Sequence, residues 1–142
     1  MISKSLEETA KFAAEVLEKV SVGKKEGATV LALRGDLGSG KTAFVKGLAK
    51  ELGVEELVTS PTFVLEKIYK INHLVFTHLV HIDAYRLEDE HELLALGFRD
   101  LISDGGNLIA IEWPERVAKA LPKDAFYINF KTIAEGEREI SW

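Results

Sequence analysis

The sequence predicts an α/β fold with three layers, in which helices pack on a mixed, mainly parallel β-sheet that includes an antiparallel hairpin. Two unbroken apolar runs, 28–33 and 108–111, are too short for helices, and such runs are typical of buried parallel strands. Segments with helical spacing of apolar residues lie before and after the first run. A glycine-rich turn at 35–40 joins this run to the next expected helix.

The first expected element is an amphipathic helix that begins near Ser5. Ser5 and Glu8 form the S-x-x-E pattern of a capping box, and apolar residues then recur at helical spacing as far as Val20. The strand at 28–33 follows. From Lys41 the apolar residues return to helical spacing, and Gly53 is expected to end this second helix.

Two β-rich stretches, 63–71 and 74–83, are expected to pair as the antiparallel hairpin. Asn72 and His73 separate them, which is the length of a two-residue hairpin connection. The remaining expected elements are a helix at 88–97, a strand at 108–112, a helix from Pro114 to Leu121, and strands at 125–130 and 138–142.

Composition narrows the classes of function. A chain of 142 residues with 46% apolar and 29% charged residues suits one globular domain, 1–142. The net charge of −5 disfavours direct binding of RNA or DNA, which usually requires a basic surface. The absence of cysteine excludes disulfides, thiol catalysis and cysteine-based zinc sites. No apolar run approaches the roughly 18 residues of a membrane span, so we expect a cytosolic protein.

Residues 35–42 match the phosphate-binding pattern G-x-x-x-x-G-K-[ST] between an expected strand and an expected helix, which predicts a P-loop NTPase-like fold. The glycines allow successive N–H groups to face the phosphate oxygens, and the helix N-terminus adds partial positive charge. We expect Lys41 to reach the β- and γ-phosphates and the Thr42 hydroxyl to bind Mg²⁺. The expected nucleotide contacts are Gly35, Asp36, Leu37, Gly38, Ser39, Gly40, Lys41 and Thr42.

ATP, with ADP as product, is the expected nucleotide, because no N-K-x-D or T-K-x-D segment for guanine is present. Asp83 and Glu112 each end an apolar strand, the place where open parallel sheets bind ligands. They are candidates for metal binding and catalysis, although a carboxylate at a strand end is also an ordinary solvated group. A zinc site at His78 and His81 is disfavoured, because residues three apart on a strand point to opposite faces.

Two further segments leave alternatives open. Residues 59–62, T-S-P-T, suit a switch that senses the γ-phosphate, and they equally suit an ordinary turn. The Trp113-Pro114 step fits either a packed aromatic corner or a wall of the nucleotide pocket.

Four segments taken together resemble the bacterial TsaE family: G-D-L-G-S-G-K-T at 35–42, S-P-T-F at 60–63, H-I-D-A-Y-R-L at 81–87 and I-E-W-P-E at 111–115. The resemblance implies a small ATPase that supports synthesis of threonylcarbamoyladenosine in tRNA. It also implies the TsaD and TsaB proteins as partners, with TsaD carrying the transfer chemistry. Contact with tRNA is then expected through the complex, with no role for DNA or a membrane.

The resemblance implies roles for the residues of the phosphate site. Thr42 and Glu112 are expected to bind Mg²⁺, and Asp83 is expected to be a second essential carboxylate close to the metal. Lys41, Asp83 and Glu112 then form the expected catalytic set.

The resemblance extends to residues outside the P-loop. Thr62 is expected in the switch-like loop, and Thr9 and Arg138 are candidates for holding the base. Ala84 stands where the family commonly has leucine, and this departure concerns packing more than chemistry.

The leading functional hypothesis is a Mg²⁺-dependent ATPase, weak alone, whose hydrolysis resets or activates a partner complex. A catalytic arginine is expected either from a partner or from Arg86. One alternative is a small-molecule kinase, although no lid insertion is evident in the sequence. The other is a nucleotide-gated binding module without significant hydrolysis.

Overall fold

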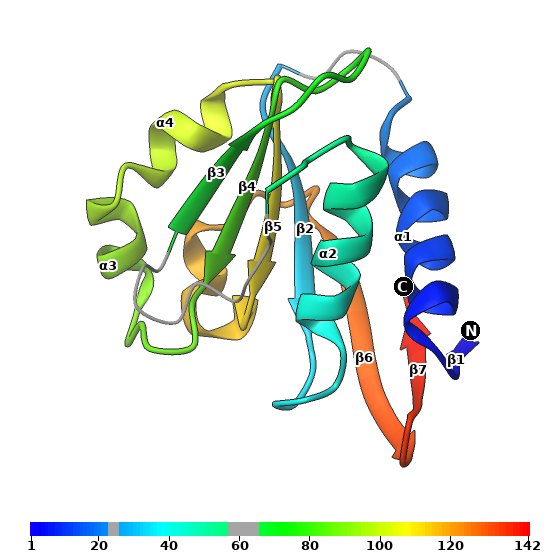
Figure 1. Ribbon diagram of the computed structural model, residues 1–142. Coiled ribbons are helices and arrows are strands. Elements are labelled where there is room, and N and C mark those ends of the chain that lie inside the picture. The colour runs from blue at the N-terminus through cyan, green and yellow to red at the C-terminus, as the bar shows by residue number, and fades with distance from the viewer. Residues whose placement is uncertain (23–25, 57–65) are drawn as a thin grey trace.

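A seven-stranded sheet runs through the computed structural model, which describes residues 1–22, 26–56 and 66–142 (Figure 1). The strands are β1 (Ile2–Ser3), β2 (Thr29–Arg34), β3 (Glu66–Lys70), β4 (His78–Asp83), β5 (Asn107–Glu112), β6 (Phe126–Ala134) and β7 (Glu137–Ser141). Their order in space is β1-β7-β6-β2-β5-β4-β3. The four inner strands β6, β2, β5 and β4 are parallel, and antiparallel strands flank them on both sides. The predicted α/β fold with a mixed, mainly parallel sheet is confirmed.

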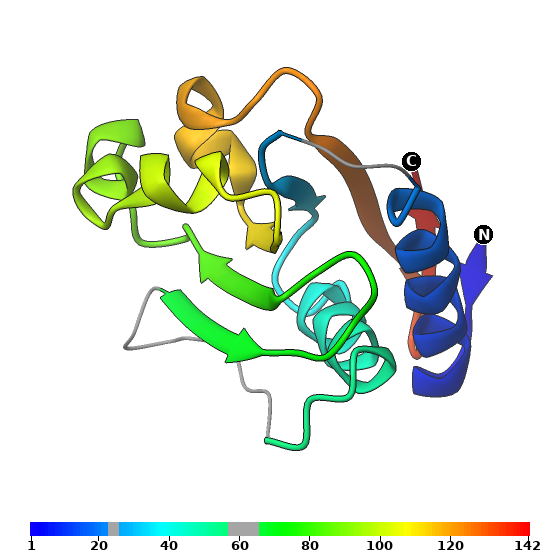
Figure 2. The ribbon, with the colours of Figure 1, turned by 90° about the horizontal axis from the view of Figure 1, so that it is seen from above.

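Helices cover both faces of this sheet (Figure 2). One face carries α1 (Leu6–Val20) and α2 (Lys41–Glu51), and the other carries α3 (Glu90–Ala95), α4 (Phe98–Ser103) and the 3-10 helix η1 (Pro114–Ala120). Along β2, Leu31 and Leu33 pack towards the first pair of helices, whereas Val30 and Ala32 pack towards the second group. Alternation along buried strands therefore produces two cores and three layers.

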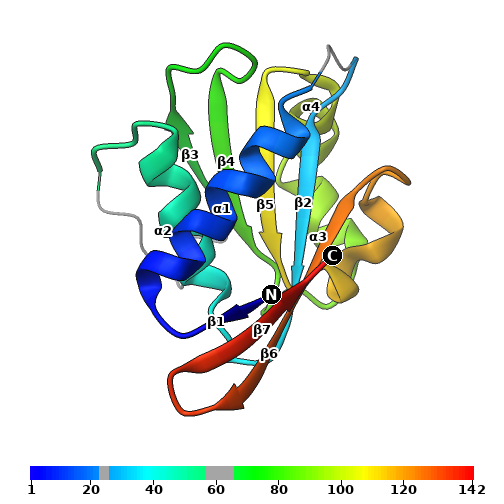
Figure 3. The ribbon, with the colours of Figure 1, turned by 90° about the vertical axis from the view of Figure 1, so that its right-hand side faces the viewer.

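The expected first helix forms as its capping box predicts. The Ser5 hydroxyl accepts a hydrogen bond from the Glu8 N–H at 3.1 Å, and the Glu8 carboxylate accepts one from the Lys4 N–H at 2.6 Å. Phe12 on the buried face meets Phe44 of α2, with ring centroids 5.9 Å apart. The C-terminal strand β7 pairs with the N-terminal strand β1, so both ends of the chain lie at the same edge of the sheet (Figure 3).

The predicted two-residue hairpin connection is wrong. β3 and β4 do pair antiparallel, but residues 71–77 connect them, and residues 63–65 of the first expected stretch lie outside the described residues. Phe76 is 1% exposed and enters the core, while the His73 ring nitrogen Nδ1 accepts the Val75 N–H at 3.0 Å. This segment therefore forms a loop, because burial of the Phe76 side chain stabilises the fold more than a longer strand would.

The other differences concern short elements. β1 and α4 were not expected, and the predicted helix at 88–97 ends sooner because Gly97, with φ 84°, interrupts the chain between α3 and α4. The helix expected from Pro114 is the 3-10 helix η1, with a non-helical residue at Val117. In the parts of the chain that the structure describes, no helix is long and apolar enough to cross a membrane.

Replacing Phe76 with alanine is expected to destabilise the protein by about 3 kcal/mol or more, because a fully buried ring leaves a cavity. Denaturant unfolding followed by circular dichroism measures this change. Leu74→Ala in the same loop is the control, since Leu74 is fully exposed, and it should change stability by less than about 0.5 kcal/mol. Equal stabilities of the two variants would contradict a core role for this loop.

Candidate nucleotide site

The glycine-rich turn lies between β2 and α2, so the strand and helix context predicted for it is confirmed. Gly40 is the N-cap of α2 with φ 104°, and no side chain caps this helix end. The first helical hydrogen bond runs from the Phe44 N–H to the Gly40 carbonyl at 2.9 Å. The N–H groups of residues 41–43 therefore have no partner inside the helix and are directed out of its end, as in anion-binding sites.

The turn tolerates no side chain at Gly35. A Cβ atom there would stand 2.6 Å from both the Phe130 carbonyl oxygen and the Ser39 hydroxyl. Glycine is thus required by close approach to β6. The turn is held against the sheet by this packing, which fixes the direction of the amide groups that follow.

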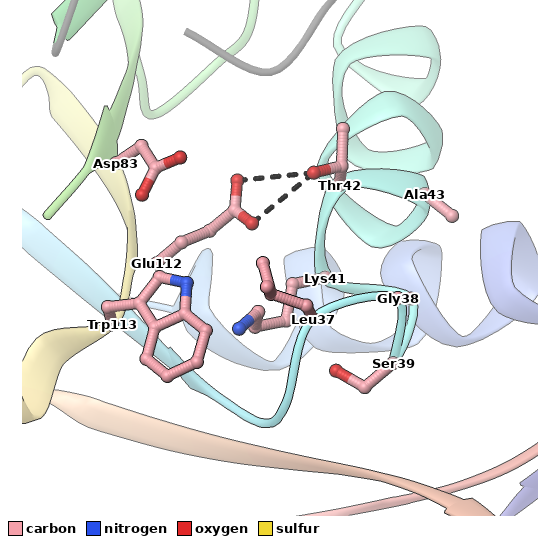
Figure 4. A pocket seen from close by; sticks show the side chains of 10 residues that line it. Leu37, Gly38, Ser39, Lys41, Thr42, Ala43, Asp83, Glu112 and Trp113 are labelled. Carbon is pink, nitrogen blue, oxygen red and sulfur yellow. Dashed lines mark hydrogen bonds between the residues drawn. The ribbon is translucent and has the colours of Figure 1, made fainter. Parts of the chain in front are cut away.

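A cleft of about 230 Å³ opens in front of the turn (Figure 4). It is a small cleft at the carboxyl ends of the parallel strands, where α/β sheets bind ligands. Its walls are Leu37, Gly38, Ser39, Gly40, Lys41, Thr42, Ala43, Asp83, Glu112 and Trp113. Three of the sequence-predicted groups, the turn and the two strand-end carboxylates, therefore meet in one place.

The ammonium group of Lys41 occupies the mouth of the turn. Its Nζ donates a hydrogen bond to the Gly35 carbonyl and lies 3.8 Å from the centroid of the Trp113 ring. Only 4% of the residue is exposed. Burial lowers the pKa of Lys41, against the opposing effect of nearby carboxylates, of which Glu112 is the strongest. Burial thus disfavours the charged form of Lys41, and an anion bound nearby would stabilise that form.

The Thr42 hydroxyl and the Glu112 carboxylate face each other in the cleft (Figure 4). The Thr42 hydroxyl lies 3.3 Å and 3.4 Å from the two carboxylate oxygens of Glu112. Glu112 is 4% exposed and continues inward to His81, whose Nε2 lies 2.6 Å from Oε2 of Glu112. A hydroxyl, a carboxylate and an imidazole thus form one chain of contacts from the cleft into the core.

Asp83 stands beside Glu112 because their strands are in register, Asp83 on β4 opposite Glu112 on β5. Its Oδ1 accepts the N–H of Tyr85 at 2.9 Å, which fixes the carboxylate at the strand end. Asp83 lines the same cleft as the turn. The sequence placed both carboxylates at strand ends, and the parallel register makes them neighbours.

The donor set suits a hard divalent cation shared with a phosphate. Among the described residues, no three His, Asp or Glu side chains converge as they would to hold a metal alone. Mg²⁺ is commonly bound by one or two protein oxygens together with phosphate and water, and Thr42 and Glu112 supply such oxygens. The residues therefore fit Mg²⁺ that arrives with a nucleotide.

Comparison with known proteins assigns the family. The family described as "Threonylcarbamoyl adenosine biosynthesis protein TsaE" matches residues 3–140. The chain belongs to the TsaE family. The relatives it resembles include the TsaE protein of Treponema pallidum (strain Nichols), 39% identical over 140 residues, covering 99% of this chain and 96% of the relative. The TsaE protein of Bacillus subtilis (strain 168) is 42% identical over 113 residues, covering 80% and 68% of the two chains.

A solved structure supports the TsaE assignment. The crystal structure of Bacillus subtilis YdiB superposes with a TM-score of 0.74 at 31% identity, covering 99% of this chain and 80% of that chain. The P-loop turn and the sheet described above lie within the region compared, so the fold is that of a solved relative.

The remaining site candidates of this member of the TsaE family lie in different surroundings. Arg138 on β7 lies directly against the turn, because a Cβ atom on Gly40 would collide with its guanidinium group. Thr9 is fully buried, and its hydroxyl pairs with that of Ser3 at 2.7 Å, away from the residues that line the cleft. Thr62 and the rest of the T-S-P-T segment lie outside the described residues.

Sequence reasoning missed the contact between His81 and Glu112, whereas for Trp113 it left open a packed corner or a pocket wall, and the structure shows features of both. His81 contacts Glu112, and its position two residues before Asp83 was a usable signal, since alternate strand residues share a face. Trp113 both lines the cleft and packs on Tyr85, with ring centroids 5.0 Å apart. Among the described residues it alone combines a side chain with a positive φ, 61°, and spacing carries no signal for that.

Proposed function

We propose that this protein binds ATP with Mg²⁺ in the cleft and hydrolyses it to ADP in support of threonylcarbamoyladenosine formation in tRNA, together with TsaD and TsaB. The observation that carries the proposal is the meeting of Lys41, Thr42 and Glu112 at the N-terminus of α2. Hydrolysis in this proposal resets or activates the partner complex. The proposal rests also on membership of the TsaE family.

Each group has a distinct role in this proposal. The amides at the start of α2 and the Lys41 ammonium hold the phosphate tail, while Thr42 and Glu112 supply oxygen ligands for Mg²⁺. Mg²⁺, when bound, neutralises charge that develops on the phosphate oxygens. Asp83, on the neighbouring strand, accepts a hydrogen bond from the attacking water and orients it. Arg138, against the turn, borders the bound nucleotide.

We expect the isolated protein to turn over slowly, on the basis of the same residues. Among the described residues, the cleft lining includes one cation, Lys41, and two carboxylates, so negative charge on the transferred group is only partly compensated. A partner or Arg86 supplies the additional positive charge in this proposal. Because the chain carries a net charge of −5, tRNA is reached through the partners. We place this function in the cytoplasm, where tRNA is modified.

Reconstitution with purified TsaD, TsaB, tRNA, a pre-activated threonylcarbamoyl donor and ATP tests the proposal. Modified tRNA should accumulate over repeated turnovers only when this chain is present and ATP can be hydrolysed, and a non-hydrolysable ATP analogue should stop it. Undiminished modification without the chain would refute the role. Phosphorylation of a metabolite would instead identify a kinase, and ATP binding without phosphate release, with partners present, a binding module.

A further inference from the structure

His81 is a buried polar residue that does not line the cleft. It is 0% exposed, on β4, and its Nε2 lies 2.6 Å from Oε2 of Glu112. Carboxylate oxygens accept hydrogen bonds and ring N–H groups donate them, so we assign the hydrogen of this contact to Nε2 of the ring. The other ring nitrogen, Nδ1, is buried without a hydrogen-bond partner among the described residues.

The orientation of Glu112 depends on this contact. Its side chain has three rotatable bonds, and on the cleft side its only hydrogen-bonding partner among the described residues is the Thr42 hydroxyl at 3.3 Å and 3.4 Å, at the long end of hydrogen bonding. The contact to His81 at 2.6 Å is much shorter and comes from a buried residue of β4, which is paired with strands on both sides. The oxygen Oε2 is thus held from behind by His81, and in this orientation both carboxylate oxygens lie within 3.4 Å of the Thr42 hydroxyl.

A purely structural role explains this arrangement poorly. A buried imidazole with one unpaired nitrogen costs free energy, and an apolar residue would fill the same space in the core without that cost. Buried polar groups retained under such conditions are typical of sites where they orient a functional neighbour. The neighbour here is the carboxylate that faces the cleft.

We infer that His81 is a positioning residue, which donates a hydrogen bond from Nε2 to Glu112 and so holds that carboxylate in the orientation that binds Mg²⁺ beside Thr42. The inference rests on the proposed function, because it assumes that Mg²⁺ enters the cleft with ATP. His81 touches neither metal nor nucleotide and acts through Glu112. Loss of such an outer partner typically weakens metal binding by 10-fold or more.

Calorimetry on the full chain separates this role from simple packing. His81→Met replaces the hydrogen-bond donor with an apolar side chain of similar size. His81→Gln instead supplies an N–H donor at a similar distance from the backbone. We expect His81→Met to raise the Mg²⁺ concentration needed for half-maximal enhancement of ATP binding by about 10-fold. ATP binding in EDTA should change less than about 2-fold, and His81→Gln should recover most of the Mg²⁺ response. An unchanged Mg²⁺ response in His81→Met, or equal losses in both variants, would overturn the inference.

Two further measurements keep the test decisive if His81→Met does not fold. His81→Asn is polar and too short to reach Glu112, so it should show the same loss of Mg²⁺ response. Ring ¹⁵N shifts of the wild-type protein, recorded without nucleotide, should show a hydrogen on Nε2, and a hydrogen on Nδ1 alone would overturn the inference. If the wild-type protein itself shows no Mg²⁺-dependent ATP binding, the proposed function fails. If the wild-type protein shows Mg²⁺-dependent ATP binding and His81→Met and His81→Asn show the same Mg²⁺ response, the positioning role fails.

Discussion

Lys41→Ala is expected to reduce ATP hydrolysis, measured with TsaD, TsaB and tRNA present, by about 10²-fold to 10³-fold. The Lys41 ammonium lies at the mouth of the turn beside the amides of α2, where it opposes charge on the transferred phosphoryl group. Its removal should also abolish ATP-dependent support of tRNA modification. Steady-state phosphate release and the yield of modified nucleoside measure the two effects.

The same substitution should leave the fold intact. Burial lowers the pKa of Lys41, so the folded protein carries its charge at a cost at neutral pH, and alanine removes that cost. The melting temperature should therefore stay within roughly 5 °C of wild type. Lys46→Ala is the matched control, since Lys46 lies on the same helix with an exposed side chain outside the cleft, and it should keep full activity. Full activity of Lys41→Ala would refute the proposal that this turn binds the phosphates of ATP.

Glu112→Gln is expected to raise the Mg²⁺ concentration for half-maximal ATPase activity by about 10-fold to 100-fold. Glutamine keeps the shape of the side chain but removes the negative charge that a hard divalent cation requires. Glu112 is the carboxylate within hydrogen-bonding distance of Thr42, and the two are the proposed Mg²⁺ ligands. A Mg²⁺ titration at saturating ATP measures the change.

Asp83→Asn is the matched comparison for this prediction. Asp83 lies opposite Glu112 in the sheet register and lines the same cleft, but one of its oxygens is engaged by the Tyr85 N–H. Its substitution should lower turnover at saturating Mg²⁺ while shifting the Mg²⁺ midpoint less than the glutamate substitution does. Identical Mg²⁺ titration curves for the two variants would contradict the division of roles between them.

The phosphate turn was predictable because its chemistry is local. Eight consecutive residues carry the pattern, and the neighbouring strand and helix show their own periodicity, so each part of the prediction supports the others. The same holds for the capping box at Ser5, whose hydrogen bonds form within four residues. Signals contained in one stretch of chain survive folding because few distant contacts compete with them.

The failed hairpin connection shows the opposite case. Residues 74–76 have strand-like composition, but Phe76 is drawn into a core built from α1, α2 and the sheet. The nearby residues fold into a loop to allow this burial. Local propensity amounts to tenths of a kcal/mol per residue, whereas burial of an aromatic ring contributes several times more.

The sequence by itself determined the α/β class, the position of the phosphate turn and the two carboxylates at strand ends. Tertiary structure alone decided that His81 stands behind Glu112, that Arg138 lies against Gly40 and that Trp113 stacks over Lys41. The physical reason is the separation along the chain of the residues that interact. Hydrogen-bonding and steric patterns within a few residues are written in the order of the chain, whereas contacts across strands depend on a register that the whole core selects.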